Sequence, residues 1–121
     1  MRAYQVAGAL LKLAWMDAER VKHHRVTRDV ASQLYSAVGS ISANLAEGYS
    51  RSSGRDRARI FEYALGSARE AEEWYRCSLP VLGDAIVIER LEMLAEIKRI
   101  LLAVIPRERD RLIRPKPVAG V

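Results

Sequence analysis

The sequence predicts an all-α protein, an antiparallel four-helix bundle with up-down-up-down topology. Half of the 121 residues are hydrophobic and 29% are charged, a composition typical of a globular domain. Seven glycines and four prolines leave long segments uninterrupted. Within these segments apolar residues recur at spacings of three and four, the period of one helix face. Together these observations favour a bundle of long helices.

The length predicts one domain over residues 1–114, followed by a flexible C-terminal tail at 115–121. Short breaks separate the apolar patterns inside the domain. Long helices joined by short loops become antiparallel neighbours. The predicted helices cover about residues 2–22, 28–47, 54–79 and 84–110.

The first helix carries two adjacent apolar stripes. One consists of Val6, Leu10 and Leu13, and the other of Ala7, Leu11, Ala14, Ala18 and Val21.

The second helix has both a start signal and a stop signal. Thr27 is a suitable N-cap, Asp29 suits the positive end of the helix dipole, and Gly48 is expected to end the helix. Its apolar face consists of Val30, Leu34, Val38 or Ala37, Ile41 and Leu45.

The third helix follows Ser53 and Asp56, which resemble a capping box, and precedes Pro80. Its small-residue seam favours close helix packing. The seam consists of Ile60, Ala64, Ser67, Ala71 and Trp74, flanked by Phe61, Ala68, Tyr75 and Leu79.

The fourth helix follows a break at Pro80–Gly83, and Asp84 can cap it. Pro106 should end or kink this helix unless a new first turn starts there. Its apolar positions are Ile86, Val87, Ile88, Leu91, Met93, Leu94, Ile97, Ile100, Leu101, Val104 and Ile105.

The first and fourth helices are more apolar than a lone bundle requires. A helix in such a bundle needs one apolar stripe, and a second stripe left in water would favour association. We therefore expect a homo-oligomer. The alternative is that these stripes are wide core faces of a compact monomer.

Positive charge is predicted to gather at one end of the bundle. The turn between the second and third helices and the end of the fourth helix should meet there. These segments hold nine basic and three acidic residues, and the rest of the chain holds 11 and 12. The basic residues are Arg51, Arg55, Arg57, Arg59, Arg107, Arg109, Arg111, Arg114 and Lys116.

Arginine binds phosphate through two parallel hydrogen bonds and stacks on bases, so this end is a candidate nucleic-acid site. The alternatives are a solvated face or pairing with acidic residues of a neighbouring subunit.

We find no motif for catalysis, a cofactor or a metal. The two histidines, His23 and His24, are adjacent and project poorly toward one ion. Cys77 is the single cysteine, which suits a reducing cytoplasm, and we expect it to be a small buried apolar residue. No apolar run approaches the roughly 20 residues of a membrane span. We expect a cytoplasmic protein that is not an enzyme.

Two runs carry a family resemblance. Ser40–Arg51 fits the pattern S-x-x-A-N-x-A-E-G-x-x-R, and Arg59–Glu73 follows as a helix with aromatic, small, Gly-Ser and Glu positions. The sequence thereby resembles the bacterial four-helix-bundle proteins called 23S ribosomal RNA intervening-sequence proteins. The motif residues are Ser42, Asn44, Glu47, Gly48, Gly66, Ser67 and Glu70.

The motif residues also have structural interpretations. Asn44 could hydrogen-bond to Glu47 or to the backbone of a neighbouring helix. Gly66 and Ser67 would allow close packing opposite Asn44.

The resemblance implies a ring-like homo-oligomer, a pentamer in known members, with no established catalytic activity. It also implies a likeness in fold to accessory proteins of diversity-generating retroelements, which pair with a reverse transcriptase and bind nucleic acid. We expect a non-enzymatic oligomeric bundle that binds RNA or DNA through its arginine-rich end. The alternative is a protein-interaction adaptor, for example for a reverse transcriptase or a ribosome-associated partner, with no direct nucleic-acid role.

Overall fold

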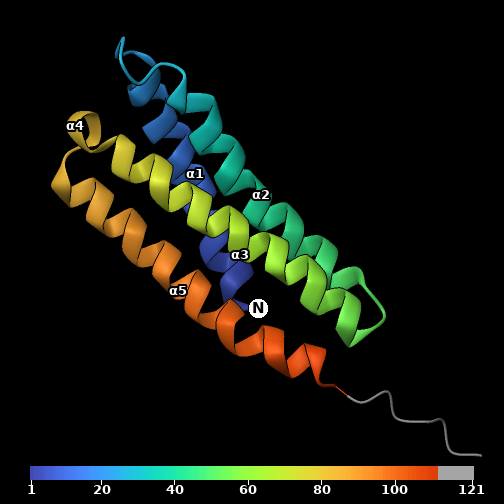
Figure 1. Ribbon diagram of the computed structural model, residues 1–121. Coiled ribbons are helices and arrows are strands. Elements are labelled where there is room, and N and C mark those ends of the chain that lie inside the picture. Colours follow the sequence, from blue (N-terminus) through green and yellow to red (C-terminus); the bar gives the residue numbers. More distant parts are fainter. Residues whose placement is uncertain (112–121) are drawn as a thin grey trace, which may run out of the picture.

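The computed structural model describes residues 1–111, which form five helices and no strand. The long helices lie side by side, and one short helical turn at Leu79–Leu82 joins the last two of them (Figure 1). The all-α prediction is confirmed for this part of the chain. The predicted tail at 115–121 and Arg114 lie outside the described residues. The helices are α1 (Arg2–Lys22), α2 (Val30–Ser50), α3 (Gly54–Cys77), α4 (Leu79–Leu82) and α5 (Asp84–Arg109).

The helices enclose one apolar core. Helix α1 packs against α2 and α5, and α3 packs against the same two helices from the other side. The edge formed by α1 and α2 therefore lies opposite the edge formed by α3 and α5. The largest fully buried apolar side chains are Leu10, Leu34, Ile41, Leu45, Phe61, Tyr75, Leu94, Ile97 and Leu101.

Helix α2 ends later than the sequence predicts. Gly48 is not a stop, because the helix continues to Ser50. Gly48 is required for packing instead, because a Cβ at this position would lie only 2.5 Å from Cε1 of Phe61. The missing side chain makes room for this ring, which is packed edge-to-face against Tyr49.

The predicted Thr27 N-cap is also wrong. Helix α2 begins at Val30 with Asp29 as N-cap, and no side chain bonds to its free N–H groups. Thr27 is buried, and its Oγ1 donates to the carbonyl oxygen of Val21 at 2.7 Å. The hydroxyl therefore ties the loop back to α1 rather than capping α2.

The predicted start of α3 is confirmed, since Oγ of Ser53 accepts from the backbone N–H of Asp56 at 3.1 Å. Its buried face differs from the predicted seam. Residues assigned to the flank, such as Phe61 and Tyr75, are fully buried, whereas Ser67 and Trp74 are half-buried.

The prediction that Cys77 is buried is wrong, because its thiol is exposed on the last residue of α3. Helix α3 therefore ends before the predicted residue 79. The Pro80–Gly83 break contains one helical turn, α4, with Pro80 in its first turn. Gly83 ends that turn with a φ of 86° and is the N-cap of α5. Asp84 is the first residue of α5 and makes no side-chain cap.

Helix α5 continues through Pro106 to Arg109, one residue short of the predicted end. In the second apolar stripe of α1, Ala7, Ala14 and Val21 are fully buried, and Leu11 and Ala18 are partly buried against the core. On α5, Leu91, Met93 and Ile100 are partly buried in the same way. The large apolar side chains of these two helices that stay at least two-fifths exposed are Tyr4, Trp15, Met16, Ile88 and Leu102.

Candidate nucleic-acid interface

The two arginine-bearing segments meet at one end of the molecule. Gly54, the first residue of α3, lies against the last turn of α5, where a Cβ would overlap the carbonyl oxygen of Glu108. Nε and Nη2 of Arg57 donate to Oε2 of Glu108 at 3.0 and 2.9 Å. Nη1 of Arg57 donates to the carbonyl oxygen of Arg51 at 2.9 Å, which ties in the end of α2. We call this the arginine end; its described members are Arg51, Arg55, Arg57, Arg59, Arg107, Arg109 and Arg111.

Arg57 holds the arginine end together rather than facing solvent. Its side chain is 15% exposed and its partner Glu108 is 21% exposed. A guanidinium whose donors are occupied in this way has little left for a ligand. The structure therefore assigns Arg57 a positioning role, unlike the more exposed arginines around it.

Carboxylates neutralise more of the arginine end than the sequence count suggested. That count left out Glu47, whose Oε1 accepts from Arg51 at 2.5 Å, and Glu62, which pairs with Arg109. Glu47 lies in the last turn of α2, and Glu62 lies in the third turn of α3. Five of the seven described arginines have a carboxylate partner: Arg51, Arg57, Arg59, Arg109 and Arg111.

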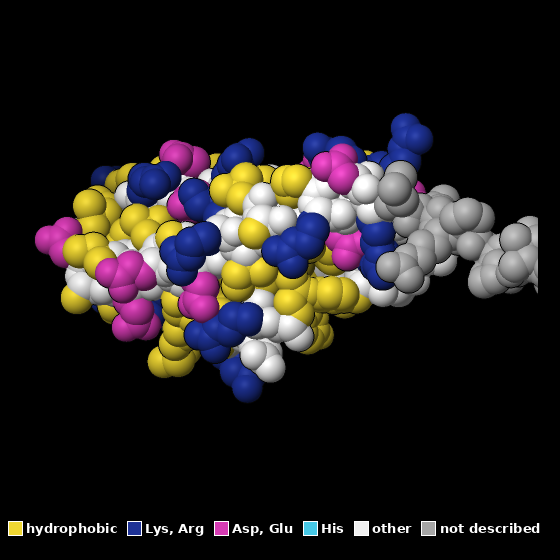
Figure 2. Space-filling view, turned by 90° about the horizontal axis from the view of Figure 1, so that it is seen from below, with side chains coloured by type: hydrophobic (Ala, Val, Ile, Leu, Met, Phe, Trp, Pro, Cys, Tyr) yellow, Lys and Arg dark blue, Asp and Glu magenta, His cyan; other side chains and the backbone are white. Residues whose placement is uncertain are grey.

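Charge is also less concentrated than predicted. Figure 2 shows Lys and Arg side chains along most of the length of the face it displays, with acidic and apolar side chains between them. Within residues 1–111, no carboxylate lies within 4.0 Å of the Arg55 or Arg107 side-chain nitrogens. Both side chains are exposed, so they are the arginines most available to an anion.

A cleft of about 510 Å³ lies between the start of α3 and the end of α5. Three arginines and two carboxylates face it, together with Ala58. Next to it, a hollow of about 400 Å³ shares Glu62 and Arg109 and has an apolar floor that includes Leu102 and Ile105. The charged residues of the cleft are Arg55, Asp56, Arg59, Glu62 and Arg109.

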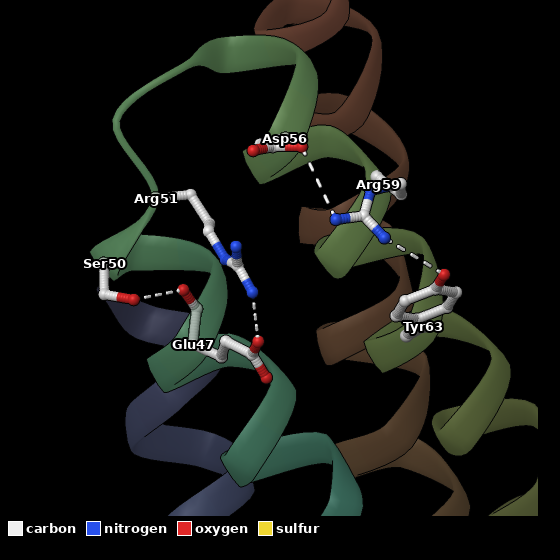
Figure 3. Close-up of polar contacts among 6 residues, drawn as sticks. All are labelled: Glu47, Ser50, Arg51, Asp56, Arg59 and Tyr63. Carbon is white, nitrogen blue, oxygen red and sulfur yellow. Dashed lines mark hydrogen bonds and ion pairs between the residues drawn. The ribbon is translucent and has the colours of Figure 1, made fainter.

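Arg59 links this cleft to an exposed aromatic ring. Figure 3 shows its guanidinium between Asp56 and Tyr63. One nitrogen, Nη1, donates to Oη of Tyr63 at 3.4 Å, and Nη2 approaches Oδ1 of Asp56 at 3.5 Å. The guanidinium carbon lies 5.9 Å from the Tyr63 ring centroid, within cation–π range. The hydrogen bond to Tyr63, together with the nearby Asp56, raises the pKa of Arg59 above its usual value.

The family model described as 23S rRNA-intervening sequence protein matches residues 1–103. The chain belongs to this family. The match extends well beyond the central runs that carry the sequence resemblance and includes α1 to α4 and most of α5. Arg107, Arg109 and Arg111 lie beyond the matched residues. These comparisons found no matching curated protein and no matching solved structure.

Three of the family-motif residues take part in packing or pairing. Gly48 accommodates Phe61, and Glu47 pairs with Arg51, so it is not engaged by Asn44 as one interpretation suggested. Oε1 of Glu70 accepts from Nε1 of Trp74 at 3.1 Å.

The remaining motif residues lack such contacts. Ser42 has a buried side-chain oxygen with no hydrogen-bond partner among the described residues, and Asn44 and Ser67 are half-buried. The expectation that Gly66 allows close packing within the bundle is wrong. Gly66 is exposed, and a Cβ there would meet nothing within 4 Å.

The sequence analysis did not predict a buried polar cluster that lies between α1, α3 and α5. Oδ2 of Asp17 accepts from Oη of Tyr75 at 2.8 Å and from Nε of Arg90 at 2.7 Å. Nη2 of Arg90 donates to the other carboxylate oxygen at 3.2 Å. Asp17 and Arg90 are 2% and 7% exposed, so this ion pair joins α1 to α5 inside the bundle, with Tyr75 of α3 as a third member.

In the sequence, this cluster is indicated by two charged residues that fall on the apolar faces of their helices. Asp17 follows Leu10 and Ala14 on one face, and Arg90 lies between Val87 and Leu94 at helical spacing. Burial, together with the nearby charge of Asp17, raises the pKa of Tyr75 far above its ordinary value. Burial is the largest single influence on the pKa of Arg90 and lowers it, but the hydrogen bond and charge of Asp17, together with the nearby Tyr75 and Glu89, leave that pKa raised.

Within residues 1–111 no group of three or more His, Cys, Asp or Glu residues could hold a metal ion. No helix there is long and apolar enough to cross a membrane.

Proposed function

We propose that this member of the family is a non-enzymatic, oligomeric helical bundle that binds RNA or DNA through its arginine end. The observation that carries the proposal is the cleft between α3 and α5, to which Arg55, Arg59 and Arg109 contribute. Guanidinium groups converging on a concave surface suit the oxygens of a phosphate. Exposed ion pairs such as Arg59 with Asp56 are weak, so a phosphate can replace the carboxylate.

The proposal includes antiparallel up-down-up-down topology for the four long helices. The Arg57–Glu108 pair supports it at one end, where α3 begins and α5 finishes. At the other end Nη2 of Arg20, in the last turn of α1, donates to the carbonyl oxygen of Val81 in α4 at 3.1 Å.

We further propose that copies associate through the edge formed by α1 and α2, as a ring that family resemblance favours as a pentamer. Trp15 is 59% exposed there and packs edge-to-face against Tyr35. Helix α2 carries one charged residue, Glu47, so its outer face demands little desolvation when another surface covers it. This edge lies opposite the cleft, which would leave the arginine end accessible in the assembly.

The proposed activity is binding, in the bacterial cytoplasm and without a cofactor. Cys77 is a free, exposed thiol, which suits a reducing compartment. The carboxylates at the cleft, Asp56 and Glu62, form ion pairs with arginines, and neither histidine nor cysteine is among the described residues that line the cleft.

The salt dependence of binding tests the proposal. Each phosphate neutralised on duplex DNA contributes about −0.9 to the slope of log K against log salt. We expect a clearly negative slope for the wild type, measured by fluorescence anisotropy on labelled RNA and DNA. Replacing both Arg55 and Arg107 with glutamine should reduce the magnitude of this slope by about 2, because we expect each arginine to contact one phosphate.

Arg76→Gln is the matched control, because Arg76 is exposed on the last turn of α3, away from the arginine end. It should leave the slope unchanged. A wild-type slope near zero, or no binding at low salt, would discard the proposal.

A protein-interaction adaptor is the second candidate, and the hollow beside the cleft favours it. Its floor includes Leu102, which is 54% exposed and could be covered by an apolar partner such as a segment of a reverse transcriptase or a ribosome-associated protein. Partner binding that persists after nuclease treatment, in the Arg55→Gln, Arg107→Gln variant, would favour the adaptor.

A further inference from the structure

We propose that the arginine end selects single-stranded nucleic acid, with one unstacked base lying on Tyr63 and the neighbouring phosphate in the cleft. This inference rests on the proposed nucleic-acid function and deepens it, because it names the form of nucleic acid that the site accepts.

Tyr63 is an exposed aromatic ring without a packing role. It is 53% exposed on the outer side of α3, and it is absent from the apolar core. By contrast Phe61, two residues earlier, is almost fully buried against Gly48. An exposed ring of this kind offers a face on which a base can stack.

The ring and the cleft are adjacent. Arg59 lines the cleft and also contacts Tyr63, through a hydrogen bond to its hydroxyl and a guanidinium carbon 5.9 Å from the ring centroid. Residues 59 and 63 are one helical turn apart, which is about 6 Å along the axis. A short step along one strand can therefore place a phosphate at Arg59 and the attached base at Tyr63.

The cleft offers more than one cation to that phosphate. Arg55 lies one turn before Arg59 and has no carboxylate within 4.0 Å among residues 1–111. Arg59 and Asp56 are about half exposed, at 51% and 48%, so their ion pair is weak and exchangeable. The site therefore combines available arginines with an aromatic face.

This combination favours a single strand over a duplex. Inside a duplex the base faces are already stacked on one another, and only the strand ends present a free face. Proteins that bind single strands pair a basic groove with aromatic side chains on which bases stack, with little sequence preference. We therefore expect the preference to follow strandedness rather than base sequence.

The experiment compares three probes of about 12 nucleotides by fluorescence anisotropy: an oligouridine RNA, a blunt RNA duplex and an abasic strand of the same length. The variants are Tyr63→Ala, Tyr63→Leu and Tyr63→Phe, with circular dichroism to check folding. Tyr4→Ala is the matched control, because Tyr4 is 46% exposed on α1.

We expect Tyr63→Ala and Tyr63→Leu to weaken oligouridine binding about tenfold, the loss typical of one base–aromatic stack. Tyr63→Phe should stay within about threefold of the wild type, since it keeps the ring. The wild type should bind the abasic strand about as weakly as Tyr63→Ala binds oligouridine, and Tyr4→Ala should have no effect.

Three results overturn the inference and leave the proposed function standing. In the first, Tyr63→Ala binds oligouridine as well as the wild type, while Arg55→Gln with Arg107→Gln binds it weakly. In the second, Tyr63→Ala weakens duplex and single-strand binding equally. In the third, the wild type binds the abasic strand as well as oligouridine. Failure of the wild type to bind any of the probes would instead defeat the proposed function itself.

Discussion

Asp17 is the residue on which three helices converge. Its carboxylate accepts hydrogen bonds from Tyr75 of α3 and Arg90 of α5, and almost none of it reaches solvent. Burying such a charge is expensive, and the desolvation is offset only while the partners stay in place. The cluster therefore specifies how the helices fit together more than it adds net stability.

Removing Asp17 should be far more damaging than removing an exposed acid. Asp17→Ala removes the buried partner of the Arg90 guanidinium and leaves it only the exposed Glu89, 2.6 Å from Nη1, so we expect a loss of about 3–5 kcal/mol in unfolding free energy. Urea denaturation followed by circular dichroism measures it. Glu73→Ala, at an exposed pair with Arg76, is the control and should cost under about 0.5 kcal/mol. Equal losses in the two variants would contradict the role of the cluster.

Tyr75 should make the protein sensitive to alkaline pH. Burial, and then Asp17, raise its pKa in the folded chain above the ordinary 10.0. The folded state thus keeps a proton that the unfolded state loses, so this contribution is fully present below about pH 10 and declines as pH rises further. We expect a steeper fall in unfolding free energy between about pH 10 and 12 for the wild type than for Tyr75→Phe. Parallel pH profiles would refute this.

At this scale the sequence predicted apolar positions well and charged ones poorly. Leu34, Ile41 and Leu45 are buried as their spacing indicated. Asp17 and Arg90 also occupy inward helical positions, but a charged side chain is ordinarily assigned to solvent. Their burial depends on a partner 73 residues away, which no local pattern contains.

At the scale of the helix, two glycines that resemble each other in sequence have opposite surroundings. Gly48 lies inside α2 against a buried ring, whereas Gly66 lies on the open side of α3. Neither has a positive φ, so backbone strain plays no part in either position.

The same substitution should therefore have opposite signs at these two sites. Gly48→Ala forces Phe61 to move, and we expect a loss of about 1–3 kcal/mol from overpacking. Gly66→Ala meets nothing and should raise helix stability by about 0.5–1 kcal/mol. Thermal denaturation of the two variants side by side measures this. A gain in stability at position 48, or a loss of stability at position 66, would contradict the packing described for these two glycines.

Gly54 governs how closely α3 approaches α5. Gly54→Ala places a methyl group on the Glu108 carbonyl oxygen and 3.2 Å from Cβ of Arg111. We expect a loss of about 1–3 kcal/mol and a weaker affinity for nucleic acid, since the cleft depends on that approach. Denaturation and anisotropy measure the two effects. Ala71→Gly, buried on the same helix but away from the cleft, is the control and should lower stability without separating α3 from α5. Unchanged binding in Gly54→Ala would count against the proposed cleft.

The sequence predicted where the long helices lie but not all of their ends. Apolar periodicity marked each long helix, and Ser53 correctly marked the start of α3. Gly48 misled because glycine serves both as a helix stop and as a point of close contact, and only Phe61 decides between them. The turn α4 was missed because Pro80 favours the first turn of a helix as well as its interruption.

For the molecule as a whole, self-association is the property most directly open to measurement. We expect light scattering to give a mass several times the 13.6 kDa of one chain. Trp15→Ser combined with Met16→Ser should lower that mass, because both side chains are more than half exposed on α1. Ile88→Ser, on α5, is the control and should leave the mass unchanged. A wild-type mass equal to one chain would refute the proposed assembly.

The sequence predicted the meeting of the arginine segments but overestimated their excess charge. Counting residues in the loop and the last turn left out Glu47 and Glu62, which belong to the adjoining helices and reach back toward the arginines. The sequence pattern does not single out Tyr63; its exposure beside Arg59 in the folded chain makes it the candidate for the proposed stacking contact.

The Asp17 cluster also sets an order of events during synthesis. Arg90 leaves the ribosome long after Asp17, since 73 positions separate the two. Until then the carboxylate of Asp17 on the newly made α1 lacks the Arg90 partner that it has in the buried core of the folded protein. An emerging chain that lacks α5 should consequently stay loose and hydrated, and locking of the tertiary structure waits for the last helix to arrive.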